Sequence, residues 1–170
     1  MLIFLVGFMG AGKTYLGKQW SKKYHWSFYD VDAEIEQTEG TSIAQIFEQK
    51  GEAYFRNIEA KTLRNMQHYT KAIIACGGGT PCYFDNMQWM NEVGITVFLN
   101  ASLPTIQHHI KVDQAKRPLI AGLSEVALFD FIKTKWEQRL PFYEQSSITL
   151  YPNQLNEQGF QTILNYIPHA

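Results

Sequence analysis

Residues 7–14 constrain this chain more than any other segment. They are Gly-Phe-Met-Gly-Ala-Gly-Lys-Thr and match the pattern G-x-x-x-x-G-K-[ST], which marks a phosphate-binding loop between a strand and a helix. Both flanks have the required character, because the apolar run Leu2–Val6 precedes the loop and Lys13–Tyr24 has apolar residues at helical spacing. The sequence therefore predicts a strand, a loop for nucleoside triphosphate phosphates and a helix.

The fixed positions of this loop have separate physical roles. Gly7, Gly10 and Gly12 let the backbone wrap tightly with its N–H groups turned inward, and the helix N-terminus adds positive partial charge. We expect Lys13 to bind the β- and γ-phosphates and the Thr14 hydroxyl to be a ligand of Mg²⁺. The residues predicted to bind the nucleotide are Gly10, Ala11, Gly12, Lys13, Thr14 and Tyr15.

Short apolar runs alternate with longer amphipathic segments, which indicates a parallel sheet covered by helices in an α/β domain. The expected strands are Leu2–Val6, residues 27–29, Ala72–Ala75, Ile95–Leu99 and Ile148–Leu150. Helices are expected over Lys13–Tyr24 and residues 33–37, from Ser42 to a stop at Gly51, over residues 52–67, and after the caps Asp85, Ser102 and Ser124. The last of these is expected to run to about Arg139, with Val126, Phe129, Lys133 and Trp136 three or four residues apart. The polar segment 111–123 is predicted to be a mobile loop.

Length and charge exclude several classes of protein. A chain of 170 residues fits one domain, and 15 Lys and Arg against 16 Asp and Glu argue against a general DNA-binding or membrane-surface protein. No run of 18 apolar residues is present to span a membrane. With two cysteines and no export signal, we expect a cytoplasmic protein.

A pair of aspartates separates this chain from other nucleotide-binding classes. The segments N-K-x-D and D-x-x-G of a GTPase do not occur, nor does an apolar run ending in Asp-Glu. Instead Asp30 and Asp32 follow an apolar run, where the strand ends of a parallel sheet meet their ligands. One carboxylate could serve Mg²⁺ or activate a hydroxyl, and the other could accept hydrogen bonds from a polyol. The alternative is that Asp30 only caps the following helix.

Two further features have both a functional and a structural interpretation. Residues 77–79 are consecutive glycines at a strand end, which indicates close approach to the backbone, or else a plain flexible turn. Arg56 lies three residues before Glu59 on a predicted helix, so the pair could hold the guanidinium in place. The alternative for Arg56 is a solvated surface position.

Taken together, these segments resemble the shikimate kinases, P-loop kinases with a fold like that of the nucleoside-monophosphate kinases. The matching segments are residues 7–14, Asp30-Val31-Asp32, Phe55-Arg56-Asn57-Ile58-Glu59, Gly77-Gly78-Gly79, Arg117-Pro118-Leu119, and Arg139 with Phe142-Tyr143. The resemblance implies a three-layer sandwich with a five-stranded parallel sheet of order 2-3-1-4-5, a shikimate-binding region at about 32–60 and a mobile lid at about 111–123. It also implies a monomer that transfers the ATP γ-phosphoryl group to the 3-hydroxyl of shikimate, in chorismate and aromatic amino acid biosynthesis.

The same resemblance assigns roles to individual residues. Asp32 would accept hydrogen bonds from the substrate hydroxyls, and Gly77, Gly78 and Gly79 would contact the substrate through their backbone. Arg56 and Arg139 would bind the substrate carboxylate. Asp30 would lie near Mg²⁺ through water and orient or deprotonate the hydroxyl. Lys13, Asp30 and Arg117 would be catalytic, with Arg117 closing over the phosphates. Phe47 and Phe55 would line the substrate pocket or belong to the core.

The chain also departs from the family pattern. Ile110, with Lys111 beside it, stands where an arginine commonly stacks on adenine, Cys76 replaces a hydroxyl residue before the triple glycine, and Tyr15 replaces Ser or Thr. The alternatives are a gluconate or nucleoside-monophosphate kinase on the same fold, or an ATP-binding regulator without turnover.

Overall fold

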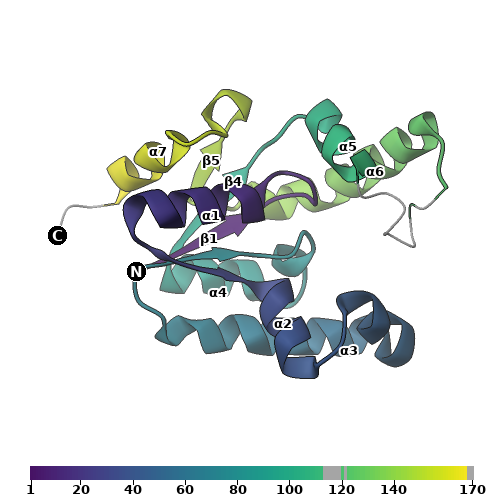
Figure 1. The fold of residues 1–170 in the computed structure, drawn as a ribbon, viewed down its shortest axis with the longest axis horizontal. Coiled ribbons are helices and arrows are strands. Elements are labelled where there is room, and N and C mark those ends of the chain that lie inside the picture. Colours follow the sequence, from purple (N-terminus) through teal and green to yellow (C-terminus); the bar gives the residue numbers. More distant parts are fainter. Residues whose placement is uncertain (113–119, 121, 168–170) are drawn as a thin grey trace.

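Five parallel strands form the centre of the computed structural model, which describes residues 1–112, 120 and 122–167 (Figure 1). They are β1 (Leu2–Val6), β2 (Ser27–Asp30), β3 (Ala72–Ala75), β4 (Ile95–Leu99) and β5 (Ile148–Leu150). Their order is β2-β3-β1-β4-β5, and every neighbouring pair is parallel, as predicted. The central strand β1 is buried along its whole length, as expected for a parallel sheet covered on both faces.

The described part of the chain has seven α-helices, six of them between strands and α7 after the last strand. They are α1 (Lys13–Tyr24), α2 (Val31–Glu39), α3 (Ile43–Asn65), α4 (Asn86–Val93), α5 (Leu103–Val112), α6 (Glu125–Tyr143) and α7 (Gly159–Tyr166). Short 3₁₀ turns are η1 (Met66–His68), η2 (Thr80–Cys82) and η4 (Pro152–Gln154). No helix among the described residues has the length and apolar character needed to cross a membrane.

Alternate side chains of β1 show how the helices cover the sheet. Phe4 meets Trp89 of α4 edge-on, with 5.8 Å between the ring centroids. The neighbouring Leu5 points the other way, and a Cβ added to Gly17 of α1 would lie 3.2 Å from Leu5 Cδ1. The sheet therefore lies between α1 on one face and α4 on the other, which Figure 1 shows. This is the predicted three-layer arrangement.

Helix α3 has a break at the position that the sequence predicts. Ser42 and Gln45 form the expected capping box at its N-terminus. Gly51 has φ 80° and ψ 170°, which is not helical, so two helical segments meet there and run on as one element to Asn65. The positive φ is the reason for glycine at this position. The break precedes the segment that carries Arg56.

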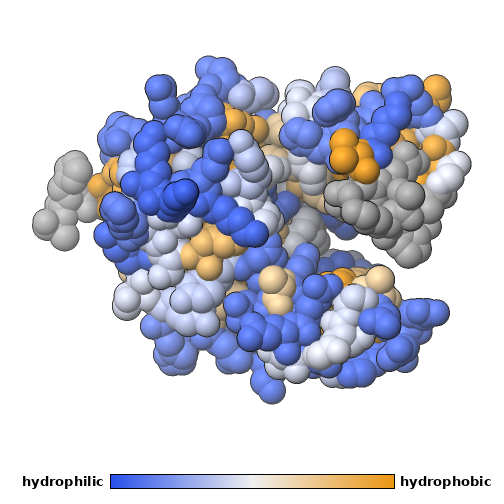
Figure 2. Space-filling view, in the orientation of Figure 1, coloured by the Kyte–Doolittle hydropathy of each residue, from blue (hydrophilic) through white to orange (hydrophobic). Residues whose placement is uncertain are grey.

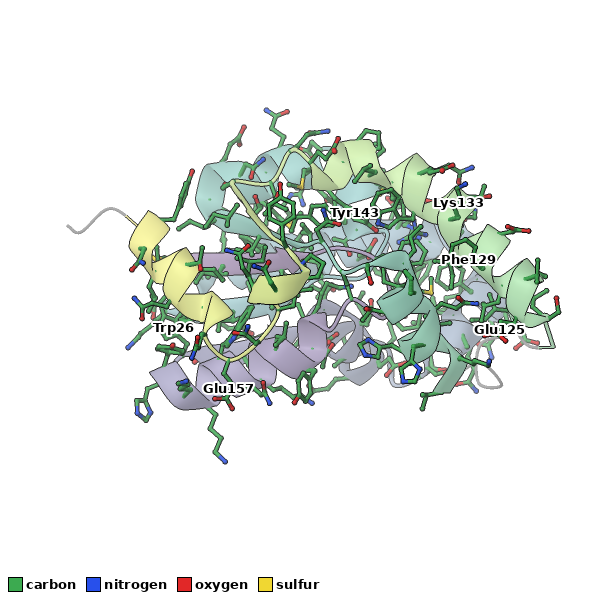
Figure 3. All side chains as sticks on the ribbon, turned by 90° about the horizontal axis from the view of Figure 1, so that it is seen from above. Trp26, Glu125, Phe129, Lys133, Tyr143 and Glu157 are labelled. Atoms are coloured by element: carbon green, nitrogen blue, oxygen red, sulfur yellow. The ribbon has the colours of Figure 1, made fainter. Side chains whose placement is uncertain are left out.

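The helix after Ser124 forms as predicted, but the residues whose spacing predicts it do not define its buried face. The helix runs past Arg139 to Tyr143, and its buried residues are Leu128, Ile132 and Tyr143. Val126 is 72% exposed and Lys133 is exposed. Figure 3 shows Phe129 and Lys133 along α6. Both faces of this helix carry apolar residues at helical spacing, so the spacing could not choose between them.

Two smaller expectations have different outcomes. Asp85 precedes α4 as predicted, but its side chain does not cap the helix and is paired with Arg64 instead. Most of the predicted lid, residues 111–123, lies outside the described residues, and Arg117 is among those. The lid's mobility therefore stays a prediction.

Candidate active site

The phosphate-binding loop joins β1 to α1 at the carboxyl edge of the sheet. Gly7, Gly10 and Gly12 have φ of 138°, 79° and 93°, in the region that favours glycine. At Gly7 a Cβ would also lie 2.9 Å from Leu99 O, so the strand end of β4 leaves no space for a side chain. The loop therefore has the tight backbone that the motif predicts.

Lys13 lies inside this loop. Its Nζ donates to the carbonyl oxygens of Gly7 at 2.8 Å and Phe8 at 2.9 Å. Burial lowers the pKa of Lys13 to about 8, and the negative charge of nearby Asp32 opposes that shift. Within the described part of the chain, no carboxylate forms an ion pair with this ammonium group, which leaves it available to a phosphate.

Thr14 and Asp30 come together at the other side of the loop. Thr14 Oγ1 donates to Asp30 Oδ2 at 2.7 Å. Asp30 Oδ1 accepts from the N–H groups of Asp32 at 3.1 Å and Ala33 at 3.4 Å, so the same carboxylate caps α2. The capping interpretation of Asp30 is therefore confirmed, and its role toward Mg²⁺ or a hydroxyl stays a prediction. Hydroxyl and carboxylate oxygens side by side suit Mg²⁺, which uses one or two protein oxygens together with phosphates and water.

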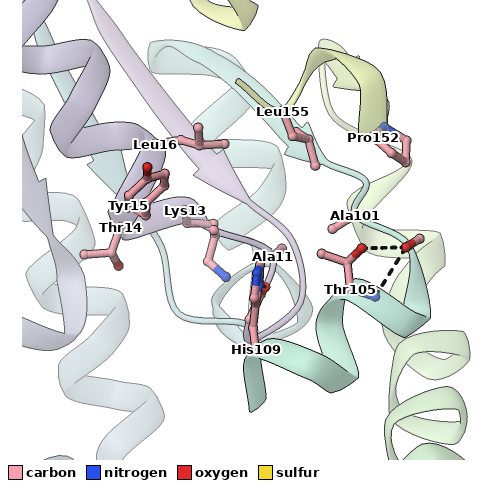
Figure 4. Close-up of a pocket in the computed structure, with 13 residues that line it drawn as sticks. Ala11, Lys13, Thr14, Tyr15, Leu16, Ala101, Thr105, His109, Pro152 and Leu155 are labelled. Carbon is pink, nitrogen blue, oxygen red and sulfur yellow. Dashed lines mark hydrogen bonds between the residues drawn. The ribbon is translucent and has the colours of Figure 1, made fainter. Parts of the chain in front are cut away.

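A cavity of about 820 Å³ opens over the loop (Figure 4). Its lining includes every residue predicted to bind the nucleotide within the loop, from Gly10 to Tyr15. Lining residues that the sequence analysis missed are Leu16, Ala101, Ser102, Thr105, His109, Pro152 and Leu155. Except for Leu16, they come from the segment after β4, from α5 and from the segment after β5. No motif marks them, because only the sheet order brings these segments next to the loop.

Helix α5 presents His109, rather than Ile110 or Lys111, to this cavity. The Nδ1 atom of His109 lies 2.7 Å from Gly10 O. Ile110 is 1% exposed, and its Cγ1 would lie 3.1 Å from a Cβ at Gly10. Lys111 pairs with Glu125 at 3.2 Å. In this structure Lys111 is therefore turned toward the first residue of α6 and not toward the cavity.

Among the described residues, three side chains have a buried polar atom without a hydrogen-bond partner: Asp32 Oδ1, Arg139 Nη1 and Ser146 Oγ. The first two lie beyond the loop, beside the triple glycine. Burial raises the pKa of Asp32 to about 6, with further contributions from Asp30 and Glu59. Unsatisfied buried polar atoms are rare in folded proteins, and a site for a polar ligand accounts for both.

The triple glycine lies against charged groups at each of its three positions. A Cβ at Gly77 would lie 3.1 Å from Asp32 Oδ1, one at Gly78 would lie 3.2 Å from Arg139 Nη1, and one at Gly79 would lie 2.8 Å from Arg56 Nη2. Gly78 also faces the phosphate-binding loop, because its Cβ would lie 3.2 Å from the Met9 backbone N. The glycines therefore let the charged side chains approach the backbone and the loop, which a plain flexible turn would not explain.

Arg56 is 8% exposed, so the surface interpretation of this arginine is wrong. Its Nη1 donates to Glu59 Oε2 at 2.9 Å, as the sequence predicts, and its Nη2 donates to Glu52 Oε1 at 3.0 Å. Its guanidinium carbon lies 4.0 Å from the centre of the Tyr83 ring. Tyr83 Oη in turn donates to Glu52 Oε1 at 2.8 Å. Sequence analysis missed Glu52 and Tyr83, although a carboxylate four residues before Arg56 is a recognisable helical pair.

The remaining predicted residues pack around this group. Phe55 is buried, and Phe47 covers it with 4.7 Å between the ring centroids. Tyr143 Oη donates to Gly78 O at 2.6 Å, which ties the end of α6 to the triple glycine. The Cys76 thiol lies 3.6 Å from Met90 Sδ, and burial raises the pKa of this thiol. The thiol is turned toward α4.

Figure 2 shows the surface hollowed between the α5–α6 side and the α2–α3 side of the molecule.

Comparison with known proteins agrees with this geometry. The family model described as shikimate kinase matches residues 9–168. The chain belongs to the shikimate kinase family. The shikimate kinase of Bacteroides fragilis is 38% identical over 157 residues, covering 92% of this chain and 88% of that protein.

Two solved structures of the family superpose closely. The shikimate kinase of Bacteroides thetaiotaomicron has a TM-score of 0.91 at 35% identity and covers 97% of this chain and 98% of its own. The shikimate kinase of Acinetobacter baumannii, solved in complex with shikimate, has a TM-score of 0.86 at 28% identity and covers 99% of this chain and 95% of its own. The family's P-loop kinase fold, with this strand order, is therefore the fold of this chain.

Proposed function

We propose that the protein transfers the γ-phosphoryl group of ATP to the 3-hydroxyl of shikimate, with shikimate 3-phosphate and ADP as products. The observation that carries this proposal is a pair of buried atoms beside the phosphate-binding loop, Asp32 Oδ1 and Arg139 Nη1, which have no hydrogen-bond partner in the described part of the chain. A small molecule that offers hydroxyl donors and a carboxylate would satisfy both. Family membership supports shikimate as that molecule.

On the acceptor side, the two arginines would bind the substrate carboxylate and Asp32 would bind a substrate hydroxyl. Arg139 and Arg56 lie against Gly78 and Gly79, and their planar guanidinium groups suit a carboxylate. Asp32 has an oxygen free to accept from a hydroxyl of the substrate. The backbone of residues 77–79 completes the wall.

On the nucleotide side, the triphosphate would lie on the backbone N–H groups of the loop, where α1 begins. Lys13 would exchange its bonds to the carbonyls of Gly7 and Phe8 for phosphate oxygens. The nucleoside would extend into the cavity, toward the residues of α5 and η4 that line it (Figure 4). His109 and Pro152 are the side chains there that have ring faces.

A divalent cation fits the same place. Mg²⁺ would be held by the Thr14 hydroxyl and, through water, by Asp30, and it would neutralise charge on the phosphate oxygens during transfer. Asp30 is also the carboxylate proposed to orient the attacking hydroxyl or to accept its proton. Arg117 is proposed to stabilise the transferring phosphoryl group, and it lies outside the described residues. We further propose a cytoplasmic monomer that has no nucleic acid or membrane partner and serves chorismate and aromatic amino acid biosynthesis.

The test is a coupled assay of ADP release that offers shikimate, gluconate and AMP in parallel. We expect turnover with shikimate alone. Turnover with gluconate or AMP and none with shikimate would identify a different kinase on this fold. Binding of ATP without turnover of any acceptor would indicate a regulator.

Two arginine variants test the acceptor site itself. Arg56→Ala and Arg139→Ala should each raise the KM for shikimate about a hundredfold, since loss of a buried charge pair costs about 2–5 kcal/mol. The KM for ATP should change less than about twofold. Equal losses for both substrates would contradict the assignment of these arginines to the carboxylate.

A further inference from the structure

Glu59 holds Arg56 from inside the protein. The carboxylate of Glu59 is fully buried, and its Oε2 accepts the bond from Arg56 Nη1 at 2.9 Å. The other oxygen, Oε1, points away from Arg56 and needs a donor of its own. A buried acceptor left without a donor costs about 1–3 kcal/mol, and more when it is charged. The orientation of Glu59 therefore depends on what its second oxygen meets.

The hydroxyl of Thr80 is that donor. Thr80 follows the triple glycine directly, is fully buried, and donates from Oγ1 to Glu59 Oε1 at 2.5 Å. The Thr80 N–H donates to Gly77 O at 3.1 Å, so the backbone around the hydroxyl is held as well. A Cβ at Gly77 would lie 3.0 Å from both Glu59 Oε1 and Thr80 Oγ1. This contact leaves the carboxylate little room to turn.

Thr80 is itself held through its backbone carbonyl. Asn86, also fully buried, donates from Nδ2 to Thr80 O at 2.9 Å. Its Oδ1 accepts from Arg64 Nη1 at 2.7 Å. Hydrogen bonds therefore connect Arg64, Asn86, Thr80, Glu59 and Arg56 in series, with Thr80 bonded to Asn86 through its backbone carbonyl and to Glu59 through its hydroxyl.

We propose that Thr80 is a positioning residue for the acceptor carboxylate: its hydroxyl orients Glu59, and Glu59 orients the guanidinium of Arg56. Arg56 already has Glu52 as a second partner, but Glu52 is 53% exposed, so solvent weakens that pair. Of the two partners, only Glu59 is buried with Arg56. This inference rests on the proposed role of Arg56 in binding shikimate.

The experiment compares four residues at position 80 in the full chain: Thr, Val, Ser and Ala. Thr80→Val removes the hydroxyl and keeps the shape, whereas Thr80→Ser keeps the hydroxyl and removes a methyl group. Ser and Ala differ by the hydroxyl alone, so loss of packing is common to both. For each variant we would measure the KM for shikimate and for ATP, the calorimetric dissociation constant for shikimate, and the Tm.

We expect Thr80→Val and Thr80→Ala to raise the KM and dissociation constant for shikimate about tenfold, with the KM for ATP within about twofold of wild type. Thr80→Ser should restore shikimate binding to within about threefold. Ile163→Ala, which truncates a fully buried residue of α7, is the control for destabilisation. It should lower the Tm without changing the ratio of the two KM values.

Three results would overturn the inference. One is an unchanged shikimate KM in the Val and Ala variants, and another is a rise of both KM values by the same factor. The third is a Ser variant that folds beside Val and Ala variants that do not, because that would assign the hydroxyl to stability alone. If the Thr80 variants bind shikimate as tightly as wild type and Arg56→Ala loses most of its shikimate affinity, the role of Thr80 is rejected and the proposed function stands.

Discussion

The nucleotide half and the acceptor half of this candidate site differ in the groups that form them. The half proposed to bind the phosphates consists mainly of one continuous loop, residues 7–14, in which Lys13 and Thr14 are the main polar side chains. The half proposed to bind the acceptor consists of charged side chains of α2, α3 and α6, which meet at the triple glycine. Both halves contain a buried cation, since Lys13 is 9% and Arg56 8% exposed, and in the acceptor half that cation is paired with the fully buried carboxylate of Glu59.

This difference follows from what each half has to recognise. A triphosphate is a strong anion that backbone N–H groups at a helix start can bind in almost any sequence context. A small hydroxylated carboxylate requires matched donors and acceptors, and buried ones discriminate best because an incorrect ligand leaves them unpaired. Specificity in this protein should therefore depend on side chains, and affinity for ATP on backbone shape.

The largest expected effect is on the nucleotide half. Lys13→Ala should lower kcat about a thousandfold, measured with both substrates saturating, because it removes the one buried cation of the loop. Steady-state kinetics at several ATP concentrations would measure this. The matched control is Lys22→Ala, an exposed lysine of the same helix, which should keep wild-type kinetics. A kcat within tenfold of wild type in Lys13→Ala would contradict the role of Lys13.

In the acceptor half, Asp32 should make the folding stability of the protein depend on pH. Its pKa of about 6 lies above its ordinary 3.8, so the folded protein binds this proton more tightly than the unfolded chain. The stability that results is present below pH 3.8 and is lost as the pH rises through 6. Relative to wild type, Asp32→Asn should therefore gain about 2 kcal/mol of stability between pH 4 and pH 7.

Urea unfolding of both proteins without ligand or metal, at pH 4 and pH 7, would measure this difference. A stability difference between wild type and Asp32→Asn that is the same at both pH values would show that Asp32 is not a buried carboxyl group in solution.

Two glycine variants should each change the KM for one substrate only, by an intermediate factor. Gly79→Ala places a Cβ 2.8 Å from Arg56 Nη2, so it should raise the KM for shikimate about tenfold and leave that for ATP nearly unchanged. Gly10→Ala introduces strain at φ 79° in the loop and should raise the KM for ATP instead. Each variant is the control for the other. Parallel changes in both KM values would mean that the two halves are not independent.

The smallest effect is expected at the rim of the acceptor half. Tyr83→Phe removes the bond to Glu52 Oε1 but keeps the ring 4.0 Å from Arg56 Cζ. Because Glu52 is half exposed, we expect the KM for shikimate to rise less than threefold. Initial-rate measurements over a range of shikimate concentrations suffice. A tenfold rise would place Tyr83 in the site itself.

Prediction from sequence succeeded where the information is local. The loop, the strands, the break at Gly51 and the Arg56–Glu59 pair all depend on residues within a few positions of one another. It failed where two faces compete, as in α6, whose buried residues are Leu128 and Ile132. It also did not find His109, because the neighbouring residue of a helix points in another direction and only packing selects which one meets the cavity.

By itself, the sequence determined that the chain binds a nucleoside triphosphate, that its sheet is parallel, and which charged residues were available for an acceptor. Only the tertiary structure decided that Asp32 and Arg139 would each have a buried atom with no partner among the described residues, and that Thr80 would contact Glu59. Backbone conformation follows from nearby residues through steric limits on φ and ψ. Burial and pairing of charges depend instead on contacts between segments far apart in the chain, which exist only once the sheet has brought their ends together.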